Sequence, residues 1–207
     1  MSKAVLSVVI PVKNNTGTLS ATLNTVLNQS YTYIEVVVSN NSRQEGIKEI
    51  IDGFNDRRIK YICPDAPMNF SGDWNFALSG ATGDFVTFLG DDDAALPFGY
   101  EAAMNLLSSN PNDAFTWRKL NYNWPNHIIP QQRDFLVGEH GNELVRMNAK
   151  KSLRLFSYFL LGYSELPCIY NSIVPHSAIQ RVISNTSSKK FFAGVIPDVY
   201  SSFVLAN

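Results

Sequence analysis

Three adjacent aspartates are the residues of this sequence best suited to chemistry. They lie in FLGDDDAALP, residues 88–97, directly after an apolar run. At a separation of about 6 Å and an effective dielectric of about 20, two ionised carboxylates repel each other by roughly 2–3 kcal/mol, and by less where water reaches them. A bound divalent cation would offset that repulsion. A solvated turn whose aspartates cap a helix that begins near Pro97 is the alternative without function.

Composition limits the kind of protein that carries these aspartates. The chain has 207 residues, of which 45% are hydrophobic and 17% charged, which fits one globular domain with a sizeable core. The formal net charge of -1 gives no reason to expect a nucleic-acid partner. Cys63 and Cys168 lie far apart without a CxxC pair, so the sequence indicates neither a disulfide framework nor a zinc site.

Localisation follows from the same reading of the sequence. The opening MSKAVLSVVIPV lacks a small-residue cleavage site and is more typical of a strand than of a signal peptide. The apolar segment 153–163 contains Arg154 and is too short to span a bilayer. We therefore expect a cytoplasmic protein, with any association at the inner face of the membrane made through residues outside this chain.

The first half of the chain alternates two kinds of pattern. Short β-branched runs at 5–12, 34–39, 58–63 and 84–89 are separated by helical patterns at 18–29, 46–54 and 71–81. Continuous apolar strands between amphipathic helices are typical of a parallel, helix-covered sheet. Ligands of such sheets bind at the carboxyl ends of the strands. We therefore expect Asn14 and Asn15, residues 39–42 and residues 91–93 to gather at one edge.

The second half has a less regular pattern. After Pro97 it predicts a helix to about Leu107, a strand over 114–120, a loop or lid over 121–134, a helix over 144–161, a strand over 169–174 and a helix over 176–183. The closing YSSFVLAN is apolar and helical without a stop signal. We therefore expect the chain to be a fragment that is truncated at its carboxyl end.

Several common ligand motifs do not match. The first predicted strand is followed by PVKNNTG rather than GxGxxG, and neither GxxxxGK[ST] nor GxSxG occurs. An EF-hand that starts at Asp91 would require glycine and glutamate where Leu96 and Ala102 stand. A carboxylate cluster at a strand end remains, and it suits Mg²⁺ or Mn²⁺ held together with the phosphates of a ligand. A substrate with a diphosphate is the expectation.

Three segments carry a resemblance to a known family. LSVVIPVKNN, TLNTVLNQSYTYIEVVVSNNS and ATGDFVTFLGDDDAALP resemble the first strand, the following helix and second strand, and the metal-motif strand of family-two glycosyltransferases. The resemblance implies a single-domain α/β protein of the GT-A fold, with a Rossmann-like, mostly parallel central sheet flanked by helices. It also implies an inverting enzyme that uses Mn²⁺ or Mg²⁺ to move a sugar from a nucleotide-diphosphate donor to an acceptor hydroxyl. Its donor-binding half would be 1–120, and its acceptor-side half 121–207.

Two positions depart from the family pattern. Gly90 stands where the first Asp of the family's Asp-x-Asp-Asp motif is usual, so the acidic cluster is shifted by one place. By position, Asp92 is then the metal ligand, Asp93 a supporting ligand, and Asp91 faces the ribose or the metal. The second departure is Ser39-Asn40 in place of an acidic pair of which one member binds the nucleobase. An amide both accepts and donates hydrogen bonds, so Asn40 does not by itself select uridine.

The resemblance assigns the remaining site residues. The donor-binding residues that it implies are Pro11, Val12, Asn14, Asn40, Asn75, Asp91 and Asp92. The general base is an acidic residue late in the domain, which points to Asp198, with Glu165 or Asp134 next in line. Asp198 follows Pro197 and would also suit the first turn of a helix without any catalytic part.

Other aromatic and histidine residues carry weaker expectations. Trp117, Tyr122 and Trp124 would either stack on an acceptor sugar or pack in the core. The histidines at 127, 140 and 176 have no ligand spacing, and each is expected to be a surface residue or a core residue with its hydrogen bonds satisfied.

Two other functions stay open on the sequence alone. One is a nucleotidyltransferase, although PVKNNTG is a poor match to a triphosphate-binding loop. The other is a catalytically inert domain that binds a sugar or a nucleotide. The acceptor of a transferase would be a carbohydrate or a lipid-linked molecule, and the family's common context is the synthesis of cell-surface polysaccharides or other glycans.

Overall fold

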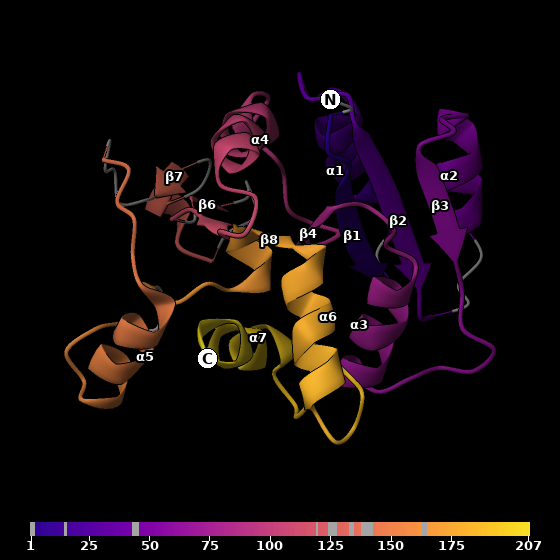
Figure 1. Cartoon of the computed structure of the whole chain (residues 1–207). Helices are drawn as coiled ribbons and strands as arrows, with labels where there is room; N and C mark the ends of the chain where they lie inside the picture. Colours follow the sequence, from indigo (N-terminus) through magenta and orange to yellow (C-terminus); the bar gives the residue numbers. More distant parts are fainter. Residues whose placement is uncertain are drawn as a thin grey trace.

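A six-stranded sheet forms the centre of the computed structural model (Figure 1). Its strands are β1 (Leu6–Val12), β2 (Ile34–Asn40), β3 (Ile59–Ile62), β4 (Phe85–Phe88), β5 (Phe115–Thr116) and β8 (Ser172–Pro175), in the order β3-β2-β1-β4-β8-β5. The first four strands pair in parallel, and β8 runs antiparallel to both β4 and β5. A second, two-stranded sheet pairs β6 (Asn121–Asn123) with β7 (Phe135–Val137). The structure describes residues 3–14, 16–42, 46–118, 120–123, 128–132, 135–137, 143–162 and 165–207.

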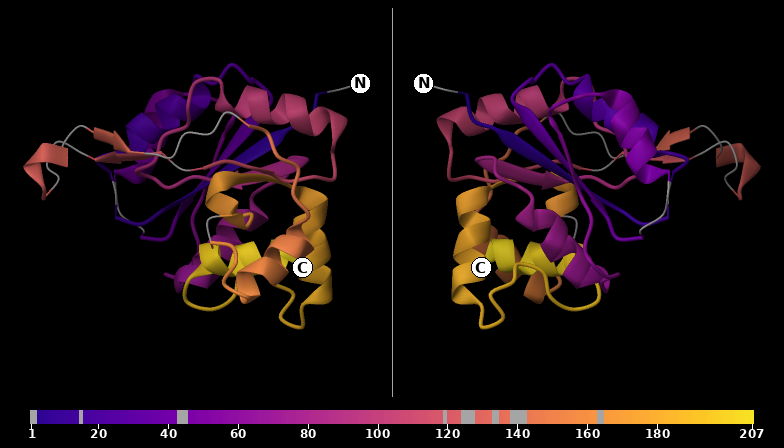
Figure 2. Two further views of the ribbon diagram at one scale, coloured as in Figure 1. Left: turned by 90° about the vertical axis from the view of Figure 1, so that its left-hand side faces the viewer. Right: turned by 90° about the vertical axis from the view of Figure 1, so that its right-hand side faces the viewer.

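Helices cover both faces of the large sheet. They are α1 (Leu19–Leu27), α2 (Ile47–Phe54), α3 (Phe70–Ser79), α4 (Gly99–Ser109), α5 (Ala149–Ser157), α6 (His176–Asn185) and α7 (Pro197–Ala206), with short 3₁₀ turns η1 (Pro130–Gln132) and η3 (Ile169–Asn171). Figure 2 shows α1, α2 and α4 on one face and α3, α6 and α7 on the other. Among the described helices, none is both long and apolar enough to cross a membrane.

The central strands are buried on both faces because each feeds two hydrophobic cores. Val8 and Ile10 of β1 belong to the core that packs against α1, α2 and α4. Val9, between them, belongs to the core that contains Trp74 of α3 and Ile179 of α6. A strand with this environment has to be apolar at successive positions, which is why β1 and β2 were recognisable as continuous apolar runs. The predicted α/β architecture with a mostly parallel, helix-flanked sheet is confirmed.

Three element predictions of the second half need correction. The strand expected over 169–174 begins as η3, and β8 follows it. The strand expected over 114–120 is the much shorter β5, and the stretch expected as a loop over 121–134 contains β6 and η1. The helix expected over 144–161 is the shorter α5, because the Asn148 side chain accepts a hydrogen bond from Lys151 N and begins the helix there.

The amino ends of the strands are tied together by one buried carboxylate, that of Glu35 on β2. It is 9% exposed. It accepts hydrogen bonds from Ser7 Oγ, Lys60 Nζ, Thr82 N and Oγ1, and Gly83 N. Burial acts to raise the pKa of Glu35, but the hydrogen bonds from Lys60, Ser7 and Thr82 outweigh it and lower the pKa to about 2. The carboxylate therefore stabilises the native state by joining β1, β2, β3 and the α3–β4 loop.

Replacing this carboxylate should produce a pH-dependent loss of stability. We expect Glu35→Gln to lower the free energy of unfolding by about 3 kcal/mol at pH 7, since a pKa lowered from 4.5 to about 2 corresponds to a stabilisation of that order. The stabilisation is complete above pH 4.5 and disappears as the pH falls towards 2, so the parent and the variant should converge in acid. Urea unfolding at several pH values measures this. Glu49→Gln on the exposed surface of α2 is the matched control, and an equal loss at all pH values would contradict the explanation.

Candidate active site

The carboxyl ends of β1, β2 and β4 meet at one edge of the sheet, as the sequence predicted. Val12 pairs in register with Asn40, and Asn41 N donates to Val12 O at 3.1 Å. On the other side of β1, Leu89 N donates to Val9 O at 3.0 Å, and the aspartates follow. Asn14, just after β1, has a left-handed backbone with φ 60. Asn15 lies outside the described residues.

Thr18, the N-cap residue of α1, and Thr22 within α1 hold the backbone of the aspartate run. Thr18 Oγ1 donates to Asp91 O at 2.8 Å. Thr22 Oγ1 lies within hydrogen-bond distance of two carbonyls, Asp91 O at 3.0 Å and Asp93 O at 2.8 Å. Because the helix fixes the carbonyls, the backbone is anchored while the side chains of Asp92 and Asp93 remain exposed. The sequence analysis had not assigned these threonines a part in the site.

Gly90 allows the aspartates to fold over a tight turn. Asp93 N donates to Gly90 O at 3.1 Å, and Gly90 N donates to Asp93 Oδ2 at 3.2 Å. A Cβ at Gly90 would lie 2.6 Å from Asp93 Oδ2 and 3.0 Å from Asp92 Oδ1. The aspartates do not cap the next helix, since α4 has Phe98 as its N-cap and no side-chain cap hydrogen bond. The alternative explanation of the run as a helix cap is therefore wrong.

The chemistry of this turn suits a divalent ion completed by a ligand. Within the described part of the chain, no three His, Cys, Asp or Glu side chains converge as a ready-made metal cage. Mg²⁺ in phosphate-binding sites commonly takes only one or two carboxylates and completes its shell with phosphate oxygens and water. Asp92 and Asp93 supply hard oxygen ligands of that kind on a turn held by α1. The residues present therefore fit such an ion.

Tyr170 connects the aspartate run with Asp198. Burial raises the pKa of the Tyr170 hydroxyl, and the charges of Asp93, Asp198, Asp91 and Asp92 raise it further. All four carboxylates therefore act on one side chain, although Asp198 is more than a hundred positions further along the chain. Asp198 is half-buried in the first turn of α7. Sequence reasoning missed Tyr170, because nothing in IYNSIV distinguishes it from a buried strand residue.

The sequence analysis also missed a carboxylate, that of Asp73. It is 4% exposed and lies on the buried face of α3 together with Trp74, Ala77 and Leu78. Ser39 Oγ, at the end of β2, donates to Asp73 Oδ1 at 3.5 Å. Burial raises the pKa of Asp73 to about 6, although the hydrogen bond from Ser39, the charge of Lys13 and a hydrogen bond from Asn41 act to lower it. The available signal was its spacing, four residues before Ala77 on the apolar face.

Asn75, one of the expected donor-binding residues, holds a distant segment of the chain. Its Nδ2 donates to Phe192 O at 2.8 Å and to Ser71 O at 2.6 Å. Its Oδ1 accepts from Phe191 N and Phe192 N, both at 3.0 Å. The amide therefore fixes the segment that leads into α7 and Asp198, and both of its polar atoms are engaged there.

The other expected donor contacts are at the carboxyl edge. Asn40 is buried, its Nδ2 donates to Tyr61 Oη at 3.1 Å, and its Oδ1 accepts from Ser42 N and Oγ at 3.0 and 2.7 Å. The side chain of Val12 is fully buried in the core, while Pro11 is half-buried. A ligand would therefore meet mainly backbone groups at the end of β1.

The remaining residues that the sequence singled out have other contacts or lie outside the described residues. Glu165 Oε1 accepts from Arg118 Nη2 at 3.4 Å. Trp117 is half-buried and Tyr122 is 47% exposed. Trp124, His127, Asp134 and His140 lie outside the described residues.

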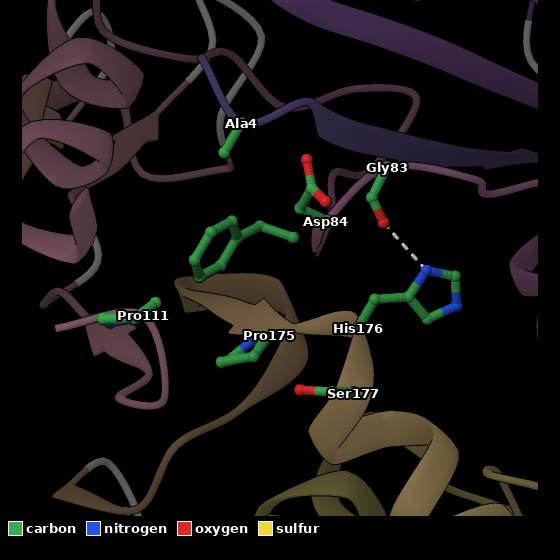
Figure 3. Close-up of a pocket in the computed structure, with 8 residues that line it drawn as sticks. Ala4, Gly83, Asp84, Pro111, Pro175, His176 and Ser177 are labelled. Atoms are coloured by element: carbon green, nitrogen blue, oxygen red, sulfur yellow. Dashed lines mark hydrogen bonds between the residues drawn. The ribbon is translucent and has the colours of Figure 1, made fainter. Parts of the chain in front are cut away.

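Two hollows lined by described residues lie away from the carboxyl edge. One, of about 510 Å³, lies where β1 and β4 begin and β8 ends, and it is lined by Ala4, Gly83, Asp84, Phe85, Pro111, Pro175, His176 and Ser177 (Figure 3). The His176 ring lies against Gly83 O at 2.9 Å, and its other nitrogen lies 3.1 Å from Gln180 Nε2. Another hollow lies beside α2 and β3. We place the site at the carboxyl edge because the carboxylates meet there, whereas His176 is a structural residue with both nitrogens engaged.

Comparison with known proteins identifies the family. The model of the family described as "Glycosyl transferase family 2" matches residues 7–182, and the chain belongs to this family. The structure of S. aureus TarS 1–349 in complex with UDP-GlcNAc has a TM-score of 0.64 at 17% identity and covers 95% of this chain and 52% of that chain. At this identity the likeness shows the fold alone. The predicted family and its GT-A type of fold are confirmed.

Two curated relatives are similar over about half of the chain. The GalNAc(5)-diNAcBac-PP-undecaprenol beta-1,3-glucosyltransferase of Campylobacter jejuni is 30% identical over 53% of this chain and 35% of its own length. The UDP-Glc:alpha-D-GlcNAc-diphosphoundecaprenol beta-1,3-glucosyltransferase WfgD of Escherichia coli is 28% identical over 53% of this chain and 44% of its own length. This chain therefore spans less than half the length of either relative.

Removing the Asn75 amide should destabilise the protein. We expect Asn75→Ala to lower the free energy of unfolding by about 2–4 kcal/mol, because it leaves the backbone N–H groups at the buried Phe191 and Phe192 without their acceptor. Denaturant unfolding measures the loss. Asn105→Ala, at an exposed position of α4, is the matched control and should change stability little. Equal stability of the two variants would refute this role of the Asn75 amide.

Proposed function

We propose that this chain is the donor-binding and catalytic part of an inverting, metal-dependent glycosyltransferase. It transfers a sugar from a nucleoside diphosphate to a hydroxyl of a carbohydrate or lipid-linked acceptor. The observation that carries the proposal is that Asp198 and the run Asp91–Asp93 all lie within electrostatic reach of the Tyr170 hydroxyl. A potential proton acceptor then stands beside a potential diphosphate and metal site, which is the pair of functions that such a transfer requires.

The names of the relatives support the substrate classes. The C. jejuni and E. coli relatives are named for undecaprenol-linked diphosphate molecules, and the E. coli name also gives UDP-Glc as donor. The structurally similar TarS was solved with UDP-GlcNAc. We therefore propose a UDP-sugar donor and a lipid-linked acceptor, in the synthesis of a cell-surface polysaccharide or related glycan at the cytoplasmic side of the membrane. Donor binding would fall to residues 1–120 and acceptor binding to residues 121–207.

The residues of the carboxyl edge would divide the reaction between them. Asp92 and Asp93 would hold Mn²⁺ or Mg²⁺, with Asp91 facing the ribose or the metal. When bound, such an ion neutralises charge that develops on the leaving diphosphate. Thr18 and Thr22 keep the aspartate backbone in place, so the ligand oxygens are positioned before the donor arrives.

Asp198 would act as the general base. As the acceptor oxygen forms a bond to the anomeric carbon, the bond from that carbon to the diphosphate oxygen breaks on the opposite side, which inverts the configuration. The proton of the acceptor hydroxyl moves to a carboxylate oxygen of Asp198. Tyr170 is protonated at neutral pH, as any tyrosine is, and its raised pKa keeps it so in more alkaline solution, so it can donate a hydrogen bond among these carboxylates.

Metal-dependent nucleotide binding tests the donor site. We expect UDP to raise the melting temperature only when Mn²⁺ or Mg²⁺ is present, because a ligand that binds the native state stabilises it by mass action. Asp92→Asn should abolish this metal-dependent shift, while the melting temperature without ligand holds or rises as the repulsion within the aspartate run decreases. Asp52→Asn, on the exposed surface of α2, should behave like the parent. If no nucleoside diphosphate raised the melting temperature of the parent, the proposed donor site would be wrong. If Asp92→Asn showed the same increase in melting temperature as the parent, only the assignment of Asp92 as a metal ligand would be wrong.

Turnover of an Asp198 variant separates binding from chemistry. Asp198→Asn should leave donor and metal affinity nearly unchanged and lower the transfer rate by roughly 10²- to 10⁴-fold, which is the usual contribution of a general base. Asparagine keeps the size of the side chain at the start of α7, so the fold should persist. The measurement compares kcat with the dissociation constant of UDP, using a lipid-linked acceptor and the full-length protein. A rate close to that of the parent would exclude Asp198 as the base and direct attention to Glu165 or Asp134.

A further inference from the structure

Among the described residues, two buried carboxylates lie at opposite edges of the sheet, and their surroundings differ. Glu35 lies at the amino ends of the strands and accepts five hydrogen bonds. Thr82 donates two of them, and Ser7, Lys60 and Gly83 donate one each. Asp73, at the carboxyl ends, is even less exposed, at 4% against 9%. It has fewer donors than Glu35: Ser39 Oγ, at the long distance of 3.5 Å, and the side chain of Asn41.

This difference in donors decides the charge state of each group. At Glu35 the donors outweigh burial and the pKa falls to about 2, whereas at Asp73 burial prevails and the pKa rises to about 6. A buried carboxylate with too few donors costs stability, and an asparagine at position 73 would fill the same space without that charge. The protein therefore holds Asp73 in an environment that a ligand with an N–H group would improve.

The position of Asp73 indicates which part of a ligand it would meet. Its neighbours are Ser39 and Asn41 at the end of β2, and Lys13 just after β1. Asn41 is itself fixed, since it donates to Val12 O and exchanges hydrogen bonds with the Met68 backbone. These hydrogen bonds fix the residues on the β2 side of β1, and the aspartate run lies on the opposite, β4 side.

The sheet order sets the distance between these two sides. β1 lies between β2 and β4, and neighbouring strands are about 4.8 Å apart, so the ends of β2 and β4 are separated by about 10 Å. A nucleoside diphosphate with its phosphates at Asp91–Asp93 would extend across the end of β1 and bring its base to the β2 side. Asp73 is the carboxylate that α3 supplies there, where β2 itself ends in the neutral pair Ser39-Asn40.

We propose that Asp73 is a specificity residue for the donor base, and that its carboxylate accepts a hydrogen bond from the ring N3–H of uracil. The proposal rests on the proposed function and extends it to a residue of this chain's third helix. It explains how the chain can select uridine although Asn40, whose amide is occupied by Tyr61 and Ser42, stands at the end of β2.

A pair of nucleotides that differ only at N3 tests the proposal. Binding of UDP and of N3-methyl-UDP to the Mn²⁺-loaded protein is measured by calorimetry for the parent, Asp73→Ser and Asp73→Asn, with Asp52→Asn as the surface control. We expect the parent and Asp52→Asn to prefer UDP over N3-methyl-UDP. Asp73→Ser should bind UDP about ten- to a hundredfold more weakly, the usual loss of a hydrogen bond to a charged group, and should no longer distinguish the two nucleotides. Asp73→Asn, which keeps a carbonyl acceptor, should retain part of the preference.

The pH dependence gives a second measurement. The charged carboxylate is the better acceptor, so the affinity of the parent for UDP should fall as the pH is lowered through about 6. Lys13, Ser39 and Asn41 face Asp73, and of these only Lys13 carries a charge. The phosphates of UDP also titrate near this pH, and the Asp73→Asn variant subtracts their contribution.

Each result has a distinct meaning. If the parent binds UDP but Asp73→Ser keeps both its affinity and its preference over N3-methyl-UDP, the assignment of Asp73 is wrong while the donor site stands. If the parent binds neither nucleotide, the proposed function fails and the role of Asp73 fails with it. Should Asp73→Ser unfold, as its melting temperature would show, Asp73→Asn decides: an unchanged preference and an unchanged pH profile would overturn the proposal.

Discussion

The packing of aromatic rings around Trp74 is the constraint on which the candidate site depends. The indole is 1% exposed, and it stacks on Phe88, the last residue of β4, at a centroid distance of 5.1 Å. Tyr170 and Phe192 meet it edge-on at 4.9 and 5.2 Å. The aspartate run follows Phe88, and α7 with Asp198 follows Phe192 a few residues later. One buried side chain therefore fixes the relative positions of segments that lie far apart in the sequence, and Asp73 is its direct neighbour in α3.

The two edges of the sheet differ in how completely their polar groups are satisfied. At the amino edge, Glu35 on β2 accepts hydrogen bonds from two neighbouring strands and a loop, which leaves little for a ligand to add. At the carboxyl edge, Thr22 donates to the backbone carbonyls of Asp91 and Asp93 rather than to a carboxylate. The side chains of Asp92 and Asp93 stay exposed there, and the hydrogen bond from Ser39 to Asp73 is long. The sheet is thus stabilised at one edge and prepared for binding at the other, in agreement with the general placement of ligands in α/β proteins.

The sequence predicted the parts of the molecule that depend on local pattern. β1 to β4 and the helices between them are visible because a strand buried on two faces must be apolar throughout, and the aspartate run is visible because it breaks such a strand. The tasks of Asn75, Tyr170 and Asp73 were not visible, because each depends on a partner distant in the chain. Asn75 binds the backbone 116 and 117 positions later, a separation that no local periodicity records. The antiparallel direction of β8 and the turn η3 before it were missed for the same reason.

The direction of β8 also affects how a chain of this type can diversify. β5 ends and β8 begins at the carboxyl edge, and the two ends of the intervening segment are joined where Trp117 N donates to Asn171 O and Asn171 Nδ2 donates to Trp117 O. The intervening segment 118–170 therefore leaves and re-enters the sheet at one point, and its last two residues, Ile169 and Tyr170, pack in the core around Trp74. Lengthening a closed loop adds only slowly to its entropic cost. Insertions and deletions in this segment would reshape the surface beside the site while the register of the sheet stays the same.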